Sequence, residues 1–281
     1  MTRPLILMLG YGYSAAALAA RLADWQVLGT TRSAVRAAGM RGAGVEPLEW
    51  ADAAAVDRAI GRARAILVSL PPDAAGDPVL RRHGAALAAA GPEWVGYLST
   101  TGVYGDRAGA WVDETAELGP VGERGRRRVA AEAAWRASGL PAHMFRLAGI
   151  YGPGRSVLDK LRAGTAQRVV RAGQVFSRIH VADVGATLAA SLARPAPGAA
   201  YNVADDLPAP PGDVIAYGAM LLGLPVPPEV PFERAELSPM ARSFWDESKR
   251  VSNRRIREEL GVALAYPDYH AGLRAILAAG G

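Results

Sequence analysis

The sequence of 281 residues predicts a doubly wound parallel α/β sheet with a smaller α/β lobe toward the C-terminus. Short β-rich runs alternate with Ala-rich helical stretches through the first half, and this alternation indicates βαβ units with parallel strands. Further along the alternation stops, and proline-rich turns at 208–213 and 224–231 indicate a lobe built from insertions. We therefore expect a core at 1–150, rejoined by 179–205, and a lobe formed mostly by 151–281.

Hydrophobic periodicity places the expected elements along the chain. The β-rich runs that we predict as strands of the core lie at 5–9, 26–30, 45–50, 65–70, 94–100 and 142–147. The intervening segments that we predict as helices lie at 13–23, 33–39, 52–62, 78–90 and 126–138. In the second half we predict a hairpin at 167–181, a helix at 181–193 and a strand at 199–205.

The composition favours a cytoplasmic protein with a small-molecule partner. There is no cysteine, which excludes a disulfide framework and a thiolate zinc site and fits a reducing compartment. The net charge is +5, but the arginines are scattered from Arg3 to Arg274 and do not form one patch. No uninterrupted apolar run reaches the roughly 18 residues that a membrane span needs. We therefore expect no nucleic-acid partner, no membrane span and no bound metal.

A glycine-rich loop follows the first predicted strand, in the stretch LGYGYSAAALAARL. Gly10 permits a tight turn, Gly12 lets the backbone approach a pyrophosphate, and Ala15 lets the next helix pack closely on the strand. Because a strand precedes this spacing and a helix follows it, the loop predicts a dinucleotide site. The residues of the loop that we expect to contact the coenzyme are Gly10, Tyr11, Gly12, Tyr13 and Ser14.

The end of the second strand bears on the choice between NAD and NADP. An NAD site usually carries an acid there, which accepts from the ribose 2′-hydroxyl, whereas this chain has VLGTTRS without an acid. Thr30, Thr31 and Arg32 suit a 2′-phosphate instead, because a guanidinium matches phosphate geometry. We therefore expect NADP in preference to NAD. The alternative is that Arg32 simply extends into solvent.

Two further strand ends supply candidate coenzyme contacts. Asp52 follows the third strand and can lie beside the adenine or cap the next helix. Ser69, Leu70 and Pro71 follow the fourth strand, and ligands of this fold collect at the carboxyl ends of strands. We expect these three residues to line the coenzyme cleft, although the proline can equally stiffen a loop.

Several short motifs occur in a characteristic order behind the glycine loop: LSTTGVYGD, GIYGPGR, RIHVADV, YNVAD and KRVSN. Together they resemble the extended short-chain dehydrogenase/reductase superfamily, on its nucleotide-sugar epimerase/dehydratase side, over nearly the whole chain. The resemblance implies a Rossmann core that carries NAD(P). It also implies a C-terminal lobe that closes over a substrate, often a sugar nucleotide.

The resemblance also assigns candidate catalytic residues. Thr100 occupies the position of the catalytic Ser/Thr, whose hydroxyl would hydrogen-bond the substrate oxygen, and Thr101 beside it would contact the substrate or simply end the strand. Relatives then carry a Tyr-x-x-x-Lys pair followed by an acid. With Glu132 as that acid, Arg124 takes the tyrosine position and Arg128 the lysine position. No tyrosine in the chain precedes a lysine by four residues.

This substitution changes the chemistry that the helix can support. Arginine keeps its proton at physiological pH, so Arg124 cannot act as a general acid or base, but it can hold an anion or a developing oxyanion. Arg128 can still donate to the nicotinamide ribose. The alternative is a salt-bridged helix face, with Glu123–Arg127, Arg128–Glu132 and Glu132–Arg136 pairs. Arg126 and Arg127 are expected to face solvent in either case.

Other residues complete the expected site. The phenol nearest to Thr100 in sequence is that of Tyr104, which we take as a candidate catalytic group. Arg155 and Arg178 can meet substrate phosphates or be exposed, and His180 can contact substrate or serve only the structure. Arg146 is expected to be structural. The Ala-rich helices at 78–90 and 126–138 would suit a homodimer.

Two hypotheses about function follow. The first is an NADP-preferring oxidoreductase or epimerase-like enzyme that binds a small anionic substrate, with Thr100 orienting its oxygen. The second is a protein that binds the coenzyme with little or no turnover, as a sensor or partner-binding module. The retained Thr100 favours the first hypothesis, and Arg124 in place of a tyrosine favours the second.

Overall fold

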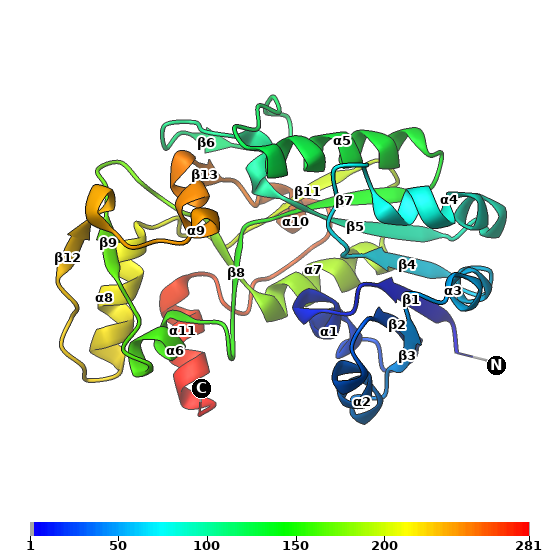
Figure 1. Cartoon of the computed structure of the whole chain (residues 1–281), viewed down its shortest axis with the longest axis horizontal. Coiled ribbons are helices and arrows are strands. Elements are labelled where there is room, and N and C mark those ends of the chain that lie inside the picture. The colour runs from blue at the N-terminus through cyan, green and yellow to red at the C-terminus, as the bar shows by residue number, and fades with distance from the viewer. Residues whose placement is uncertain (1–2, 281) are drawn as a thin grey trace.

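A parallel sheet of seven strands forms the centre of the molecule (Figure 1). The computed structural model describes residues 3–280. The strands of this sheet are β1 (Leu5–Leu9), β2 (Gln26–Thr31), β3 (Glu46–Glu49), β4 (Ala65–Val68), β5 (Trp94–Thr100), β7 (Ala142–Leu147) and β11 (Ala200–Val203). They lie in the order β11-β7-β5-β4-β1-β2-β3, and every neighbouring pair is parallel. The predicted doubly wound sheet is confirmed, and its strand order reverses between β1 and β4.

Helices cover both faces of this sheet, as Figure 1 shows for α5 and α7 on opposite sides. The covering helices are α1 (Tyr13–Ala19), α2 (Ala34–Gly42), α3 (Ala53–Ile60), α4 (Pro78–Ala90), α5 (Glu123–Ala137) and α7 (Val181–Ala193). The helices α1 and α7 share one apolar cluster through Leu18 and Leu188. The helices α3, α4 and α5 share the other, through residues such as Ile60 and Trp135. Both faces of the strands are therefore buried, as a parallel sheet requires.

The remaining elements form a lobe beside the carboxyl ends of the strands and the segments that join it to the sheet. They are β6 (Trp111–Val112), β8 (Gly149–Tyr151), α6 (Val157–Arg162), β9 (Arg168–Val170), β10 (Arg178–His180), α8 (Pro211–Leu221), β12 (Glu229–Pro231), α9 (Pro239–Ser243), β13 (Arg250–Val251), α10 (Arg254–Glu258) and α11 (Tyr269–Ala278). An apolar cluster of its own joins α6, α8 and α11 through Leu158, Val214 and Leu273.

The predicted hairpin at 167–181 is wrong. The strands β9 and β10 lie in this segment, but they do not pair with each other. Instead β9 pairs with β12 and β10 pairs with β8, both in parallel. The reason is that each strand finds a partner from a distant part of the chain, which local periodicity does not reveal.

The end of the chain returns from the lobe to the core. The strand β13 pairs in parallel with β6, which belongs to the connection between β5 and α5. Next to it, the Ser248 N–H donates to Asp106 at 2.7 Å, and the Ser248 carbonyl accepts from the backbone of Arg107 and Gly109. This pairing brings the segment around Ser248 beside the connection that follows β5.

Within residues 3–280, no helix combines the length and the apolar character that crossing a lipid bilayer would require.

Candidate active site

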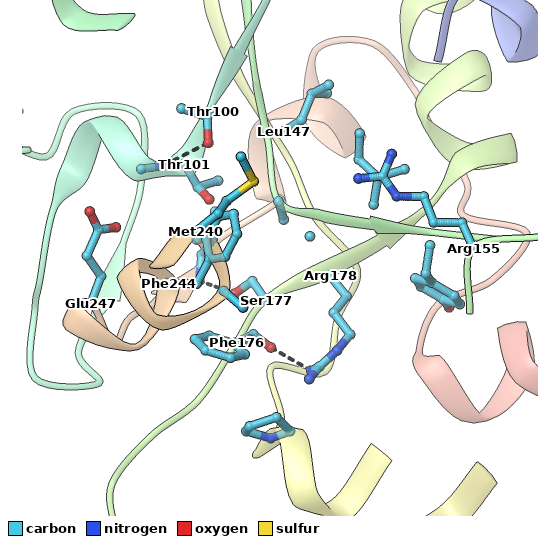
Figure 2. A pocket seen from close by; sticks show the side chains of 18 of the residues that line it. Thr100, Thr101, Leu147, Arg155, Phe176, Ser177, Arg178, Met240, Phe244 and Glu247 are labelled. Atoms are coloured by element: carbon cyan, nitrogen blue, oxygen red, sulfur yellow. Dashed lines mark hydrogen bonds between the residues drawn. The ribbon is translucent and has the colours of Figure 1, made fainter. Parts of the chain in front are cut away.

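A cleft of about 840 Å³ opens where the carboxyl ends of the strands meet the lobe. The core contributes Gly12 and Ser69 on either side of the point where the strand order reverses, and Thr100 from the end of β5. The lobe contributes Phe176, Met240 and other apolar side chains (Figure 2). The residues predicted from sequence that line this cleft are Gly12, Tyr13, Ser14, Ser69, Thr100, Thr101, Arg124, Arg128, Arg155 and Arg178.

The glycine loop has the geometry that a bound pyrophosphate needs. Gly10 adopts φ +93°, a left-handed conformation that favours glycine, and its N–H donates to the Thr30 hydroxyl at 2.7 Å. A Cβ on Gly12 would meet nothing within 4 Å, so the backbone there is open to a ligand. Within residues 3–280 no side chain caps α1, and the first residues of this helix line the cleft. The residues present therefore fit a dinucleotide.

The end of β2 presents both a cation and a carboxylate. Arg32 is exposed, and it forms no hydrogen bond or ion pair with any residue of 3–280. Thr31 accepts from the Ser33 N–H at 3.2 Å. Glu49 at the end of β3 lies opposite Thr31 in the strand register, so an acid does stand near this position. The sequence shows no acid after β2, and Glu49 comes beside this position only through the pairing of β2 with β3, since strand register is a tertiary property.

Thr100 ends β5 at the mouth of the cleft. Its hydroxyl oxygen accepts from the Gly102 N–H at 3.2 Å, and within residues 3–280 its own proton has no acceptor (Figure 2). That proton is therefore free to be donated to a substrate oxygen. The hydroxyl caps the 3₁₀ turn at Thr101–Tyr104, which fixes its direction.

The helix α5 packs unusually close to this turn. A Cβ on Gly125 would lie 3.0 Å from the Gly102 carbonyl oxygen and 2.7 Å from the Pro120 side chain, so only glycine permits the approach. As a result Arg124 and Arg128 both reach the cleft, as the resemblance implied for the tyrosine and lysine positions.

The two arginines are held differently. Arg128 donates to the Leu98 carbonyl at 2.6 Å and to the Tyr97 hydroxyl at 3.0 Å, so β5 fixes its guanidinium. Arg124 forms no hydrogen bond with any residue of 3–280 and lies 5.5 Å over the Phe244 ring. Desolvation, followed by the charge of Arg128, lowers the pKa of Arg124 below its usual value. An anion bound there would relieve both effects.

The expected salt-bridged face of α5 forms only in part. Arg127 pairs with Glu123, as predicted, and Arg126 is exposed, as predicted, and pairs with Glu123 as well. The expected Arg128–Glu132 pair is wrong, because Glu132 is fully buried and pairs with Arg146 at 2.9 Å.

The buried carboxylate of Glu132 ties α5 to the sheet. Arg146 donates to it from β7, the Ser99 hydroxyl donates to it at 2.5 Å from β5, and Arg136 reaches it at 3.3 Å. Arg146 is therefore structural, as expected. Glu132, the acid used to align the helix with the Tyr-x-x-x-Lys motif, therefore positions α5 and is shielded from the cleft.

The prediction that Tyr104 is a catalytic group is wrong. Its side chain is fully buried outside the cleft. Its hydroxyl donates to Asn202 at 2.7 Å and accepts from Arg146 at 2.8 Å, and burial raises its pKa to about 12. The sequence showed only that Tyr104 is near Thr100, and the 3₁₀ turn directs its ring into the core.

His180 takes the structural one of its two expected roles, and it does not line the cleft. It is buried at the start of α7, where its Nδ1 accepts from the Ala182 N–H at 3.2 Å. Burial lowers its pKa to about 4, so the ring is neutral. Its ring packs against Tyr151 and Tyr266.

The remaining predicted contacts lie around the cleft. Arg178 lines it, but its guanidinium is held by the carbonyls of Phe176 at 2.8 Å and Ala209 at 3.1 Å. Arg155 is exposed at the end of the cleft away from Glu247 (Figure 2). Asp52 caps α3 by accepting from the Ala55 N–H. The predicted coenzyme contacts that lie outside the cleft lining are Gly10, Tyr11, Thr31, Arg32, Asp52, Leu70 and Pro71.

The segment from α9 to β13 adds residues that were not predicted from the sequence to belong to the site. Glu247 and Lys249 line the cleft beside Gly102, and Met240 and Phe244 cover its middle (Figure 2). The KRVSN motif, which begins at Lys249, was the one signal in the sequence that could have indicated this segment.

Comparisons with known proteins agree with this geometry. No family model matches the sequence. Protein YeeZ of Escherichia coli (strain K12) is 31% identical over 285 residues, which cover 94% of this chain and 96% of YeeZ. The chain belongs to the family of Protein YeeZ, within the extended short-chain dehydrogenase/reductase superfamily. The resemblance drawn from the motifs is confirmed.

Two solved structures are similar over nearly their whole length. A functionally unknown conserved protein from Silicibacter pomeroyi DSS is 52% identical, with a TM-score of 0.93 and 99% of both chains covered. A putative NAD-dependent epimerase/dehydratase from Methylobacillus flagellatus is 27% identical, with a TM-score of 0.75 and the same coverage. The full-length match places both the sheet and the lobe of this chain within one family architecture.

Proposed function

We propose that the protein is a nicotinamide-coenzyme-dependent oxidoreductase or epimerase/dehydratase-like enzyme for a small anionic substrate, such as a nucleotide sugar. The observation that carries the proposal is the continuity of one cleft from the glycine loop at Gly12 to the hydroxyl of Thr100 and the guanidinium of Arg124, which donates to no other residue of 3–280. A coenzyme and a substrate can meet there, because the cleft volume of about 840 Å³ exceeds the size of one small ligand.

Different residues of the cleft would bind different parts of the coenzyme and the substrate. The loop at Gly10–Ser14 would hold the pyrophosphate, and the coenzyme supplies a site for reversible hydride transfer when bound. Arg128, fixed on β5, would donate to the nicotinamide ribose. Thr100 would donate to the substrate oxygen at the reacting carbon, and Arg124 would hold negative charge on the substrate.

We propose NADP in preference to NAD on the strength of Arg32, which is exposed after β2 and can meet a 2′-phosphate. Glu49 is the competing feature, because a carboxylate opposite Thr31 suits a free ribose hydroxyl. Replacing each in turn separates the two. Arg32→Ala should weaken NADPH binding and leave NADH binding unchanged. If Arg32→Ala changes neither affinity and Glu49→Ala weakens NADH binding, the preference for NADP is contradicted.

The proposal is tested in two steps. Isothermal calorimetry with NAD⁺, NADH, NADP⁺ and NADPH measures coenzyme binding to the purified chain. The chain with the tightest-binding coenzyme is then incubated with UDP-glucose, UDP-glucuronic acid and small carbonyl compounds, and products are followed by chromatography and by NAD(P)H absorbance. Conversion of any of these supports an enzyme, and absence of binding of all four coenzymes would overturn the proposal.

A second candidate function is a coenzyme-binding sensor or partner-binding protein with little turnover. Arg124 in the tyrosine position favours it, because this position then supplies no proton. Tight coenzyme binding without conversion of any compound in the panel is the result that would favour this candidate over the enzyme.

A further inference from the structure

Glu247 is placed in the cleft close to the hydroxyl of Thr100. A Cβ on Gly102 would lie 3.5 Å from the Thr100 hydroxyl oxygen and 3.9 Å from Oε2 of Glu247, so both side chains lie beside Gly102. Among the residues that line the cleft, all of which lie within 3–280, Glu247 is the only carboxylate. Thr100 and Glu247 therefore border the same part of the cleft, beside Gly102.

The backbone at Glu247 is held firmly on both sides. Its carbonyl accepts from the Gln174 side chain at 2.7 Å, and the next residue, Ser248, donates its N–H to Asp106 at 2.7 Å. The adjacent strand β13 then pairs with β6. Contacts from the lobe and from the core both fix this segment, so the carboxylate is preorganised.

Lys249 orients the carboxylate and leaves one oxygen free. The Lys249 ammonium lies 2.5 Å from Glu247 Oε2 and also donates to the Gly105 carbonyl at 2.8 Å. Oε1 accepts no hydrogen bond from any residue of 3–280. The side chain of Glu247 is 18% exposed and that of Lys249 is 10% exposed, so the pair is largely shielded from solvent. One oxygen is thus anchored and the other can receive a proton.

The phenols near the cleft are less suited to this task. Tyr13 and Tyr151 donate their hydroxyls to the backbone carbonyls of Pro153 and Asp268. Tyr97 is buried behind Arg128, and burial raises its pKa to about 12. A carboxylate with a free oxygen is a better proton acceptor near neutral pH than a phenol that is already hydrogen-bonded.

We propose that Glu247 is the proton-transfer residue of this enzyme, and that Lys249 is its positioning residue. When a substrate alcohol is oxidised, its O–H bond breaks and the proton moves to Glu247 Oε1. The electrons of that bond form the carbonyl, and the hydride on the same carbon leaves to the oxidised nicotinamide coenzyme. In the reverse direction, reduction, Glu247 returns the proton to the substrate oxygen, and the Thr100 hydroxyl hydrogen-bonds that oxygen. The inference rests on the proposed function.

The test compares Glu247→Gln and Glu247→Asp with a matched control, Asp246→Asn. Asp246 is the adjacent, exposed acid outside the cleft lining, so its variant makes the same charge change one residue away. Each protein is incubated with its coenzyme and UDP-glucose or UDP-glucuronic acid, and kcat and KM are measured separately. Coenzyme affinity by calorimetry and the unfolding midpoint show that each variant folds.

We expect Glu247→Gln to lower kcat by roughly 100-fold or more, with KM and coenzyme affinity within about threefold of the wild-type values. Glu247→Asp should retain part of the activity because the carboxylate remains, and Asp246→Asn should match the wild type. A Glu247→Gln variant with kcat within about fivefold of the wild type would overturn the inference while leaving the proposed function intact.

A structural readout is independent of turnover. In a crystal of the wild-type protein with NADPH and UDP-glucose, a pair that cannot react by oxidation, a sugar hydroxyl should lie within hydrogen-bonding distance of Glu247 Oε1. A sugar bound in the cleft without that contact counts against Glu247 alone. If the wild type converts neither nucleotide sugar and the crystal shows the cleft without sugar, the proposed substrate class fails, and the inference fails with it.

Discussion

The two walls of the cleft are built in different ways. The core wall, formed by the glycine loop, β5 and α5, rests on buried strands and on the Glu132–Arg146 ion pair. The lobe wall, formed by α9 and the segment that follows it, exposes apolar side chains, with Met240 66% and Phe244 52% exposed. Its Glu247 is held by hydrogen bonds to distant loops.

This difference separates two tasks. The core wall uses groups whose positions are set by the sheet, which suits binding of the proposed coenzyme. The lobe wall presents side chains whose identity can vary without disturbing the sheet, which suits recognition of a particular substrate. Changes to the glycine loop and to the buried groups of the core wall should therefore reduce stability or coenzyme binding. Changes to the lobe wall should act on the substrate, which Thr100 and Arg124 of the core wall also contact in the proposed function.

The largest expected effect comes from breaking the ion pair under the core wall. Glu132→Ala leaves the Arg146 guanidinium buried without its partner, which should lower the free energy of unfolding by about 3 to 5 kcal/mol. Urea denaturation followed by circular dichroism measures the change. Glu123→Ala, which removes an exposed pair on the same helix, is the control and should leave the midpoint nearly unchanged. Equal effects of the two variants would contradict the distinction.

The next effect concerns the coenzyme. Gly10→Val places a β-branched residue at φ +93°, with its Cβ 2.8 Å from the Ser69 hydroxyl oxygen. Strain of about 1 to 3 kcal/mol at this turn should weaken coenzyme binding roughly tenfold to 100-fold in calorimetry. Gly39→Ala in α2 meets nothing within 4 Å and is the matched control. Unchanged coenzyme affinity in Gly10→Val would show that the loop does not hold the pyrophosphate.

A buried acid near Arg178 should make stability depend on pH. Burial raises the pKa of Asp205 from 3.8 to about 8, with partial opposition from Arg178. The unfolded chain therefore releases this proton from about pH 4 upward while the folded chain keeps it until about pH 8, so stability is present at low pH and lost as pH rises.

The slope assigned to Asp205 can be measured by comparison. Relative to Asp205→Asn, the wild type should lose about 1.4 kcal/mol of unfolding free energy per pH unit between these two pKa values. Urea titrations at pH 5, 6 and 7 give the difference, with Glu233→Gln, an exposed acid, as the control for charge. Parallel pH profiles for the wild type and Asp205→Asn would contradict the buried-acid account.

The smallest expected effect tests the lobe wall itself. Phe244→Ala removes the ring that lies 5.5 Å from the Arg124 guanidinium. A cation–π contact of this kind contributes about 0.5 to 1 kcal/mol, so affinity for UDP-glucuronic acid should fall about two- to fivefold. Coenzyme affinity should not change, and calorimetry measures both. A larger loss of coenzyme than of substrate affinity would reverse the assignment of the two walls.

Much of the core wall was predictable because its signals are local. The spacing of Gly10, Gly12 and Ala15 requires small residues at a turn, and the alternation of strands and helices requires a parallel sheet. Tyr104 shows the limit of this reasoning. Nearness to Thr100 in sequence suggested a role in catalysis, but the 3₁₀ turn directs the ring into the core.

The sequence alone was enough to predict the fold class and the glycine loop. It also indicated Thr100 as a candidate site residue, and Arg124 and Arg128 in the positions of the tyrosine and lysine. Tertiary structure alone decided that Glu132 is buried and that Glu247 reaches the cleft. The physical reason is distance along the chain. Turn geometry and periodicity act over a few residues, whereas the pairing of β13 with β6 joins segments that no local pattern relates.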